Sequence, residues 1–340
     1  VVDMDNEARQ GNYSLLSQRM QQRLEETLNK GEQAMILLNK RGYASFIKCE
    51  SCGEPIRCPH CDVTLTYHKA ENRLKCHLCE YFTSVPQVCP ECGSTHLKKI
   101  GYGTQKIEEE LEKKYPDARI IRFDFDTTRN KNTHLKLLKD FEEHKADIML
   151  GTQMIAKGLD FSNVTFVGVL MADLSLMVPD FRASERTFQL LCQVAGRSGR
   201  GDKQGTVMIQ TFNPEHYAIK AAVKQDYEAF YKEEMLFRKK AKYPPFCHLV
   251  SVIVQSRTPK NVHLTALDIS KYLKEHLEKV RIIGPQPAFK MQDIYRERIL
   301  IKYIESKPIY EQLSIIDDYY NRTRKGGVIV ACDFNPYSTY

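Results

Sequence analysis

Short apolar runs alternate with amphipathic stretches along the first two thirds of the chain. The runs have the length of buried strands, and the stretches repeat apolar residues at the spacing of helices. Strands alternating with helices predict a mostly parallel sheet covered on both faces, with active loops at the carboxyl ends of the strands. The expected strands are 34–39, 118–124, 147–152, 164–173 and 205–212, and the expected helices are 14–29, 104–115, 132–145 and one from Ser184 to residue 201.

The last third of the chain has a different order of elements. From Cys247 the pattern is strand, helix, strand, strand, helix, strand, over 247–256, 261–279, 280–285, 295–304, 307–323 and 326–336. This is the split βαβ order of a ferredoxin-like α+β domain. A helical connector before it, residues 213–246, ends in FRKKAKYPPF. Its cations beside two aromatic residues fit either a nucleic-acid contact or a solvated helix end.

The composition is that of a water-soluble globular protein. The chain has 340 residues, of which 42% are hydrophobic and 27% charged, enough for two or three domains. No apolar run approaches the roughly 18 residues of a membrane span, and the charged N-terminal sequence is unlike a signal peptide, so we expect a cytoplasmic protein. The net charge of +7 suits a polyanionic partner without requiring one. The chain does not begin with methionine, which favours a fragment of a longer protein.

Eight of the eleven cysteines form four Cys-x-x-Cys pairs between Cys49 and Cys92. In a cytoplasmic chain this spacing indicates coordination of zinc rather than disulfides. Two pairs make one tetrahedral site, so four pairs predict two zinc ions. We favour a nested arrangement, because a sequential one leaves only five residues between the first two pairs. The predicted ligands are Cys49, Cys52, Cys89 and Cys92 for the first zinc, and Cys58, Cys61, Cys76 and Cys79 for the second.

Both predicted zinc sites are structural rather than catalytic. Four thiolates leave no open coordination position for an activated water, which disfavours a zinc hydrolase. The segment has almost no apolar sequence for a core of its own, so we expect zinc to supply its folding free energy, about 10 kcal/mol or more per site. Four nearby histidines could substitute as ligands, but eight cysteines already complete both sites; they are His60, His68, His77 and His96.

Polar residues follow one of the expected strands. The sequence LGTQMIAKGLDF leaves the strand at 147–152 and presents five candidates, Thr152, Gln153, Lys157, Gly158 and Asp160. The glycine lets the backbone approach a ligand closely. The lysine and the aspartate bring opposite charges to the same rim. A plain connecting turn is the competing interpretation.

The sequence QVAGRSGRG holds a second candidate group. It places Gln193, Arg197 and Arg200 at offsets of four and seven, on one face of the expected helix. An arginine pair arranged in this way suits a carboxylate or a phosphate. The chain nevertheless has no glycine-rich phosphate loop to hold a nucleotide. Internal ion pairs with Asp180 or Glu185 are the alternative interpretation of the arginines.

Taken together, these motifs resemble a known family. GTQMIAKGLDF and QVAGRSGRG resemble motifs V and VI of superfamily 2 helicases, and with PDFRASERTFQLL and the cysteine pairs they resemble the primosomal protein N′ family of replication-restart helicases over essentially the whole chain. The resemblance implies an α/β RecA-like helicase lobe 2 at 1–46 and 98–212, an inserted zinc region at 47–97, the connector at 213–246, and an α+β domain at 247–340 that binds DNA or partners. Position 159 is leucine where some relatives carry histidine.

The resemblance also implies roles for the candidate residues. Arginines of motif VI would reach the γ-phosphate of ATP only when a first lobe, which carries the phosphate loop, closes on this one. The implied residues are Arg200 as the arginine finger with Arg197 and Gln193 in catalysis, Gly158 and Asp160 at the nucleotide, and Thr152, Gln153 and Lys157 along the DNA backbone. Tyr295, Arg296 and Arg298 are further DNA candidates in the last domain.

Members of the family unwind DNA in the 3′→5′ direction with ATP and Mg²⁺ at stalled or collapsed forks. The partners implied are forked and single-stranded DNA, single-stranded DNA-binding protein, and primosome or helicase-loading proteins. A monomer without membrane contact is expected, with two structural Zn²⁺. This chain alone is expected to be inactive as an ATPase. The alternative is a zinc-ribbon module that binds nucleic acid or protein without motor activity.

Overall fold

The chain divides into two compact units that each combine two segments of sequence. The computed structural model describes residues 1–39, 46–60, 64–68, 72–76, 79, 81–100, 104–124, 127, 131–156, 161–178, 180–196, 204–322 and 327–338. The first unit consists of residues 1–43 and 101–234, and the second of residues 44–100 and 235–340. No helix among these described ranges is both long enough and apolar enough to cross a membrane.

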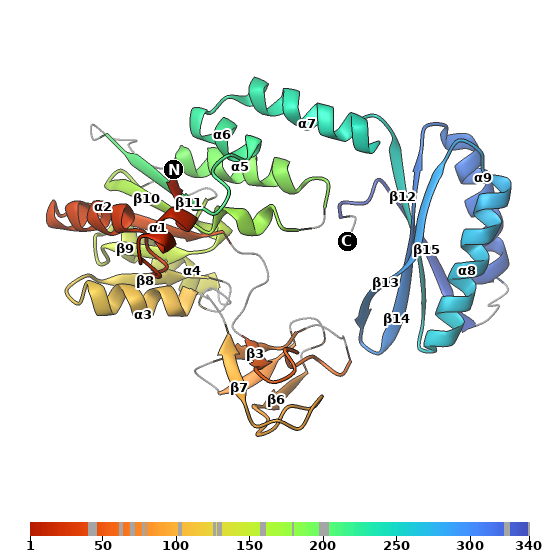
Figure 1. The fold of residues 1–340 in the computed structure, drawn as a ribbon, viewed down its shortest axis with the longest axis horizontal. Coiled ribbons are helices and arrows are strands. Elements are labelled where there is room, and N and C mark those ends of the chain that lie inside the picture. The colour runs from red at the N-terminus through yellow and green to blue at the C-terminus, as the bar shows by residue number, and fades with distance from the viewer. Residues whose placement is uncertain are drawn as a thin grey trace. The chain divides into compact units, whose positions relative to one another are not determined.

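The first unit is built on a parallel sheet of six strands, in the order β1-β11-β10-β2-β9-β8 (Figure 1). Every neighbouring pair in this sheet is parallel. The three central strands β2, β9 and β10 are buried at every position, as expected for strands covered on both faces. The strands are β1 (Val2–Asp3), β2 (Gln33–Leu38), β8 (Ile120–Phe123), β9 (Ile148–Gly151), β10 (Val164–Leu170) and β11 (Thr206–Thr211).

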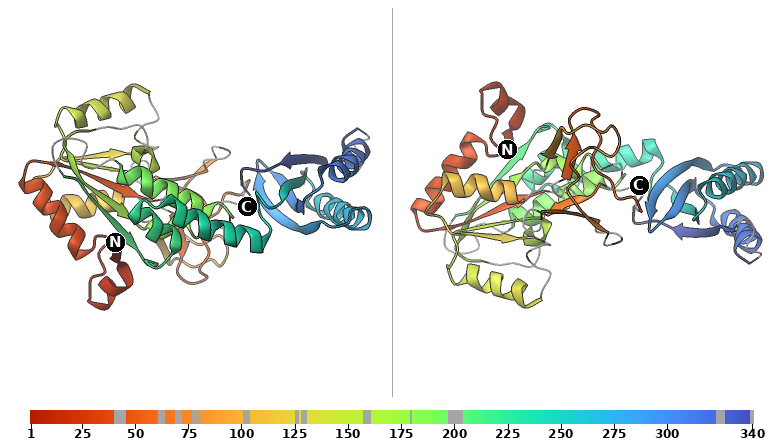
Figure 2. Two further views of the ribbon diagram at one scale, coloured as in Figure 1. Left: turned by 90° about the horizontal axis from the view of Figure 1, so that it is seen from above. Right: turned by 90° about the horizontal axis from the view of Figure 1, so that it is seen from below.

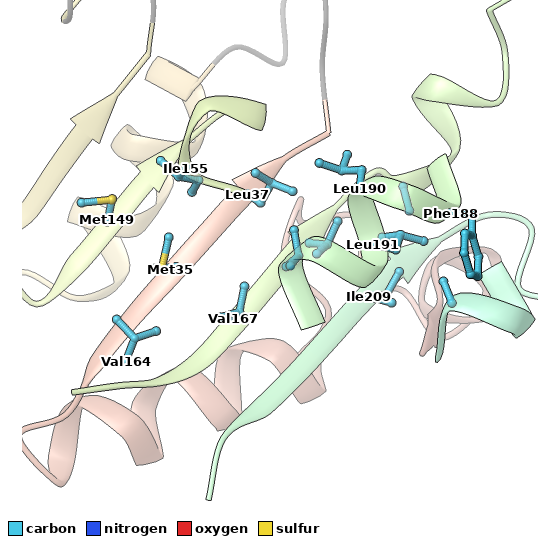
Figure 3. Packing of buried hydrophobic residues seen from close by; sticks show 14 of the residues in the cluster. Met35, Leu37, Met149, Ile155, Val164, Val167, Phe188, Leu190, Leu191 and Ile209 are labelled. Carbon is cyan, nitrogen blue, oxygen red and sulfur yellow. The ribbon is translucent and has the colours of Figure 1, made fainter. Parts of the chain in front are cut away.

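Helices cover both faces of this sheet. The helices of the unit are α1 (Met4–Arg9), α2 (Gln18–Asn29), α3 (Thr104–Lys114), α4 (Lys131–Glu142), α5 (Ala183–Ala195), α6 (Tyr217–Lys224) and the start of α7 (Tyr227–Ala241), with short 3₁₀ turns η1 (Gln153–Ala156) and η2 (Ala172–Ser175). One apolar core joins α2 and α3 to the strands. The opposite core joins α4, α5 and α6 to β2, β9, β10 and β11, and Figure 3 shows Phe188, Leu190 and Leu191 of α5 pointing into it.

Helix α2 illustrates how sequence sets these elements. Ser17 caps its first turn, since the hydroxyl oxygen accepts a hydrogen bond from the backbone N–H of Met20 at 3.2 Å. Met20, Leu24 and Thr27 are buried, at the spacing of one helical face. Lys30 follows as the C-cap, and Gly31 then adopts a φ of 67°, a conformation that glycine tolerates best.

The cysteine-rich insert folds as two small sheets. Strands β3 (Phe46–Cys49) and β7 (Leu97–Ile100) pair antiparallel and bring its two ends together, while β4 (Thr66–His68), β5 (Arg73–Lys75) and β6 (Phe82–Ser84) form a second antiparallel sheet. Contrary to the expectation of almost no core, the insert buries a small apolar cluster: Ile47, Ile56, Cys58, Leu65, Tyr67, Leu74 and Cys76. Isolated apolar residues converge there, among them Ile47, Ile56, Leu65 and Leu74, each nine positions after the one before, and no helical or strand periodicity in the sequence predicts them.

The C-terminal segment forms an antiparallel sheet in the order β13-β14-β12-β15. Its elements are β12 (His248–Ser256), α8 (Pro259–His276), β13 (Arg281–Met291), β14 (Ile294–Tyr303), α9 (Ser306–Asp317), the π-helical turn η3 (Asp318–Arg322) and β15 (Ile329–Phe334). Helices α8 and α9 lie on one face of this sheet (Figure 2) and share an apolar core with it. This is the predicted split βαβ architecture.

Several elements differ from their predicted bounds. Helix α2, for example, begins at Gln18 instead of residue 14, because Ser17 is its N-cap. Two further differences have a clear cause in the sequence. Strand β13 continues to Met291 instead of ending at Pro285, because an edge strand tolerates Pro285 and Pro287 where a central strand would lose hydrogen bonds. Helix α5 ends at Ala195 with Gly196 as its C-cap, so the single helix expected to continue through residue 201 is wrong. Glycine has low helix propensity, which favours ending the helix there.

Candidate functional site

The first cysteine cluster is built from two knuckles of the same design. Each has the sequence Cys-x-x-Cys-Gly, and the glycines Gly53 and Gly93 adopt φ values of 81° and 74°. The backbone N–H of Gly53 donates to the carbonyl of Cys49 at 3.0 Å, and that of Gly93 to the carbonyl of Cys89 at 2.8 Å. These turns direct the sulfurs of both knuckles to one point.

The sulfur atoms of the first cluster have the spacing of a tetrahedral zinc site. The Sγ atoms of Cys49, Cys52, Cys89 and Cys92 all lie within 4.8 Å of one another, with 3.6 Å between Cys49 and Cys92 and 3.7 Å between Cys52 and Cys89. Zinc–sulfur bonds of about 2.3 Å at tetrahedral angles require roughly 3.8 Å. Hydrogen bonds, the strongest from the backbone N–H of Cys52, lower the pKa of Cys49 to about 6, whereas burial and the neighbouring sulfurs raise the pKa of Cys52 to about 12.

The second cluster contains Cys58, Cys76 and Cys79, whose sulfurs also lie within 4.8 Å of one another. The Sγ atoms of Cys58 and Cys79 are 3.6 Å apart. The remaining predicted ligand, Cys61, lies outside the described residues. The structure thus brings the cysteines together in the nested order and not in the sequential one, since Cys49 and Cys52 meet Cys89 and Cys92.

Polar side chains in the first unit gather at the carboxyl ends of the parallel strands. Thr152 and Gln153 directly follow β9 and are half-buried. The side-chain amide of Gln153 donates to Asn39 Oδ1 at 3.2 Å, and Asn39 itself follows β2 and is fully buried. The amide of Asn39 donates to the carbonyl of Ala172 at 2.8 Å. One asparagine therefore joins the loops that follow three adjacent strands.

Sequence reasoning missed Asn39 and also Asp173. The carboxylate of Asp173 is buried after β10 and accepts hydrogen bonds from the Thr211 hydroxyl and from the backbone N–H groups of Phe212 and Asn213. It ties the end of β10 to the end of β11. The signal in both cases is a polar residue that closely follows a buried strand.

Several predicted residues of the two motifs lie outside the described part of the chain. These are Lys157, Gly158 and Asp160 of the first motif, and Arg197 and Arg200 of the second. Gln193 is described and is exposed on α5, two residues before the helix ends. The opposite side of α5 is buried through Phe188, Leu191 and Val194, while Ala195 is only half-buried.

Three family models match successive parts of the chain. Residues 96–202 match the helicase conserved C-terminal domain, residues 58–82 the PriA DNA helicase Cys-rich region, and residues 239–337 the primosomal protein N C-terminal domain. A parallel helicase lobe, two nested cysteine clusters and a split βαβ domain in one chain define the C-terminal part of a cysteine-rich helicase.

Relatives of the whole chain identify the family. The chain is 49% identical to replication restart protein PriA of Bacillus subtilis over 341 residues, which cover 99% of this chain and 42% of the relative. It is 40% identical to replication restart protein PriA of Chlamydia muridarum, over 100% of this chain and 46% of that relative. The chain belongs to the PriA family of replication restart proteins, and it spans less than half the length of either relative.

Comparison with solved structures finds only weak similarity to helicase domains. The C-terminal domain of the DEAD-box protein Dbp5 is 13% identical, with a TM-score of 0.31 over 63% of this chain and 88% of that domain. Because this similarity is weak, the family assignment depends on the sequence relatives alone.

Proposed function

We propose that this chain is the C-terminal part of an ATP-dependent 3′→5′ DNA helicase that recognises stalled or collapsed replication forks and starts primosome assembly. The observation that carries the proposal is the presence of nested cysteine clusters in the same chain as a helicase lobe, with 49% identity to a replication restart protein. The proposed domains keep the bounds 1–46 with 98–212, 47–97, 213–246 and 247–340.

The cysteines act as zinc ligands in this proposal. The thiolates of Cys49, Cys52, Cys89 and Cys92 would hold one Zn²⁺, and those of Cys58, Cys76 and Cys79 with Cys61 the other. Sulfur spacings of 3.6 to 3.7 Å support both sites. Zinc would supply folding free energy to the insert beyond what its small apolar cluster provides.

The motor function depends on residues at the carboxyl edge of the parallel sheet. In our proposal Thr152, Gln153 and Lys157 follow the DNA backbone, and Gly158 and Asp160 face the nucleotide. The support is positional: Thr152 and Gln153 follow β9 at the sheet edge where α/β proteins bind ligands. Asn39 and Ala172 hold this edge together, so movement of DNA and of the neighbouring loops would be linked.

Arg200 is the proposed arginine finger, with Arg197 beside it and Gln193 ordering the phosphate side. The exposure of Gln193 at the end of α5 supports a role toward a ligand rather than in the core. An arginine finger contributes roughly 10³- to 10⁵-fold in turnover, which corresponds to about 4 to 7 kcal/mol of transition-state stabilisation. ATP and Mg²⁺ would be held mainly by the rest of the protein.

The C-terminal sheet supplies a further DNA contact in this proposal. Alternate residues of β14 point away from α8 and α9, and among them are Arg296 and Arg298. Arg298 is half-buried, and burial lowers its pKa. Contact with a phosphate would stabilise this half-buried guanidinium more than it stabilises a fully solvated guanidinium. Single-stranded DNA-binding protein and helicase-loading proteins are the proposed protein partners of this monomeric, cytoplasmic enzyme.

The decisive test is the DNA-stimulated ATPase of the full-length protein that contains this chain. Arg200→Ala should lower the maximal rate about 10³-fold or more while DNA affinity changes little. Arg257→Ala, an exposed arginine in the turn after β12, is the matched control and should retain the wild-type rate. An unchanged rate for Arg200→Ala would favour a zinc-ribbon binding module without motor activity.

A further inference from the structure

The tip of the β13–β14 hairpin contacts the cysteine-rich insert, far away in sequence. The two strands pair as far as Met291 and Ile294, and Gln292 and Asp293 form the two-residue turn. Both turn residues have positive φ values, 52° and 61°. A turn of this kind usually contains glycine or asparagine, so contacts outside the hairpin must compensate for its backbone strain.

Polar contacts join this tip to the first knuckle of the second cysteine cluster. The backbone N–H of Asp293 donates to the carbonyl of His60 at 3.0 Å, and the Asp293 carboxylate lies 2.7 Å from His60 Nδ1. Lys290 Nζ donates to the carbonyl of Pro59 at 2.5 Å. Pro59 and His60 are the two residues between Cys58 and Cys61. Both carbonyls inside that knuckle therefore have their partners in the C-terminal domain.

An apolar contact reinforces the polar ones. Met291 packs against the buried cluster of the insert, which includes Cys58 and Cys76. The side chain of Lys290 is only 15% exposed, and its ammonium group is also 3.6 Å from Asp293. These contacts have the character of a packed interface rather than of a surface encounter, because a charged group is desolvated and satisfied within it.

The same tip forms one wall of the approach to a cysteine sulfur. An open pocket of about 410 Å³ lies beside the contact, lined by His60, Cys79, Tyr81, Phe82, Gln292 and Asp293. Two of these six residues belong to the hairpin. A small molecule that reaches Cys79 through this pocket would pass the turn.

The first cysteine cluster is held together by contacts within the cysteine-rich insert. Its knuckles are held by their internal turns, by the β3–β7 pair, and by a hydrogen bond of 2.7 Å between the Ser51 and Ser94 hydroxyls. Among the described residues, the hydrogen-bond and ion-pair partners of these knuckles all lie in the insert itself. The two clusters thus differ in what holds them.

We propose that Lys290, Met291 and Asp293 are positioning residues for the second zinc site, an inference that rests on the zinc role proposed above. They fix the backbone at Pro59 and His60 so that the sulfur of Cys58 stays in ligating geometry with those of Cys76 and Cys79, and they restrict access to Cys79. Loss of these contacts accelerates metal release from the second site and leaves the first site unchanged. The C-terminal domain is then part of the metal site, although it supplies no ligand.

The test measures metal release at each cysteine of the zinc-loaded full-length protein. A chelator and N-ethylmaleimide are added together, samples are quenched over time, and peptide mass spectrometry gives the alkylation rate of each thiol. Lys290→Met should accelerate alkylation of Cys58, Cys76 and Cys79 about fivefold to tenfold, because one charge-assisted hydrogen bond is lost. Alkylation at the first cluster should stay within twofold of wild type, and Lys290→Arg should restore most of the protection.

Matched variants separate this effect from general destabilisation. Asp293→Asn removes the charge while keeping a residue that tolerates positive φ, and should accelerate release at the second cluster only. Asp318→Asn, which breaks an exposed 2.8 Å pair with Arg322 in η3, should change neither cluster. Lys98→Met, which breaks the 2.8 Å pair with Glu50 beside the first cluster, should leave the second unchanged.

Two failures are distinguishable. If the wild-type protein contains no zinc, the proposed metal role fails and the inference falls with it. The inference alone is wrong if wild type contains two zinc ions and Lys290→Met and Asp293→Asn release both ions at wild-type rates. It is also wrong if these variants accelerate release from both clusters to the same extent. Circular dichroism of each variant confirms that it is folded before the rates are compared.

Discussion

At the scale of single residues, polar side chains connect the strands of the helicase lobe where they begin and where they end. Asn39 and Asp173 do so at the carboxyl ends of the strands, and the Arg119–Asp147 pair does so at the opposite edge. Asp147 precedes β9 and accepts hydrogen bonds from the backbone N–H, Nε and Nη2 of Arg119 at 2.7 to 3.0 Å. A bidentate pair with this geometry contributes more than an ordinary surface ion pair.

Asp147 should make the stability of the lobe depend on pH. Hydrogen bonds from Arg119 lower the pKa of its carboxyl below the usual 3.8. A carboxyl group whose pKa is lowered in the folded state stabilises the protein at pH values above its unfolded-state pKa. This stabilisation is lost as the pH falls through the folded-state pKa. Asp147→Asn should therefore cost about 1 to 2 kcal/mol at pH 7, and the difference from wild type should shrink below about pH 4.

Urea unfolding of the lobe at pH 7, 5 and 3 measures this difference. Asp117→Asn is the control, since Asp117 is exposed and lies just before Arg119 in sequence. A difference between Asp147→Asn and wild type that stays constant down to pH 3 would contradict the assignment.

At the scale of elements, the close approach of the β8 and β9 backbones fixes the point where β9 ends and the first motif begins. A Cβ atom on Gly151 would lie 2.4 Å from the carbonyl oxygen of Phe123 in β8 and 2.8 Å from the Ile155 side chain. Only glycine fits between the two strands there, and Thr152 and Gln153 follow immediately. The position of the motif therefore depends on this contact.

Gly151→Ala should destabilise the lobe by about 2 kcal/mol or more, because the backbone of β8 must move. Gly168→Ala in β10 is the matched control: its Cβ would meet the ends of the Ile36 and Met20 side chains at 2.9 and 3.1 Å, which can shift. Thermal unfolding should place Gly151→Ala clearly below Gly168→Ala. A lower melting temperature for Gly168→Ala than for Gly151→Ala would show that the β8 backbone moves more easily than the Ile36 and Met20 side chains do.

The elements also show what a sequence can and cannot predict. Mostly apolar runs such as 34–39 predict the buried strands because burial on both faces disfavours polar side chains. The end of β13 escaped prediction because Pro285 and Pro287 look like strand breakers, and only the sheet order reveals an edge strand. The end of α5 at Gly196 escaped prediction because Gln193, Arg197 and Arg200 keep the spacing of one helical face beyond that glycine.

The sequence likewise predicts one part of the candidate site, the cysteine ligands, and not the contacts that surround them. Cysteine spacing predicts the nested clusters, because a tetrahedral metal site depends on only a few residues and these lie close together in the sequence. Nothing in the sequence predicts that Lys290 and Asp293 meet Pro59 and His60, because residues more than 200 positions apart are brought together only by tertiary packing.

At the scale of the whole molecule, the chain passes between its two units three times. The insert, residues 44–100, groups with the C-terminal segment and not with the lobe that it interrupts in sequence. The two apolar cores of the lobe contain no residue of the insert among those described. Folding of the lobe and folding of the insert should therefore be separable.

Removing zinc should unfold the insert and spare the lobe. After chelation, hydrogen exchange should lose protection in peptides from 46–60 and 72–100 and at the hairpin tip around Met291, while β2, β9 and β10 keep theirs. Returning zinc should restore the protection, and chelator in the presence of excess zinc is the control. Loss of protection in β9 at the same rate would show that the metal supports the lobe as well.

The contact between the hairpin and the insert also has a consequence for protein synthesis. The ribosome completes the last cysteine of the insert, Cys92, roughly 200 residues before Lys290 and Asp293. At about 5 to 20 residues per second, this interval lasts about 10 to 40 s. During it a zinc ion held by the second cluster would lack the contacts that we propose secure it later. Supply of the metal to the newborn chain, and protection of its thiols from oxidation, matter most in that interval.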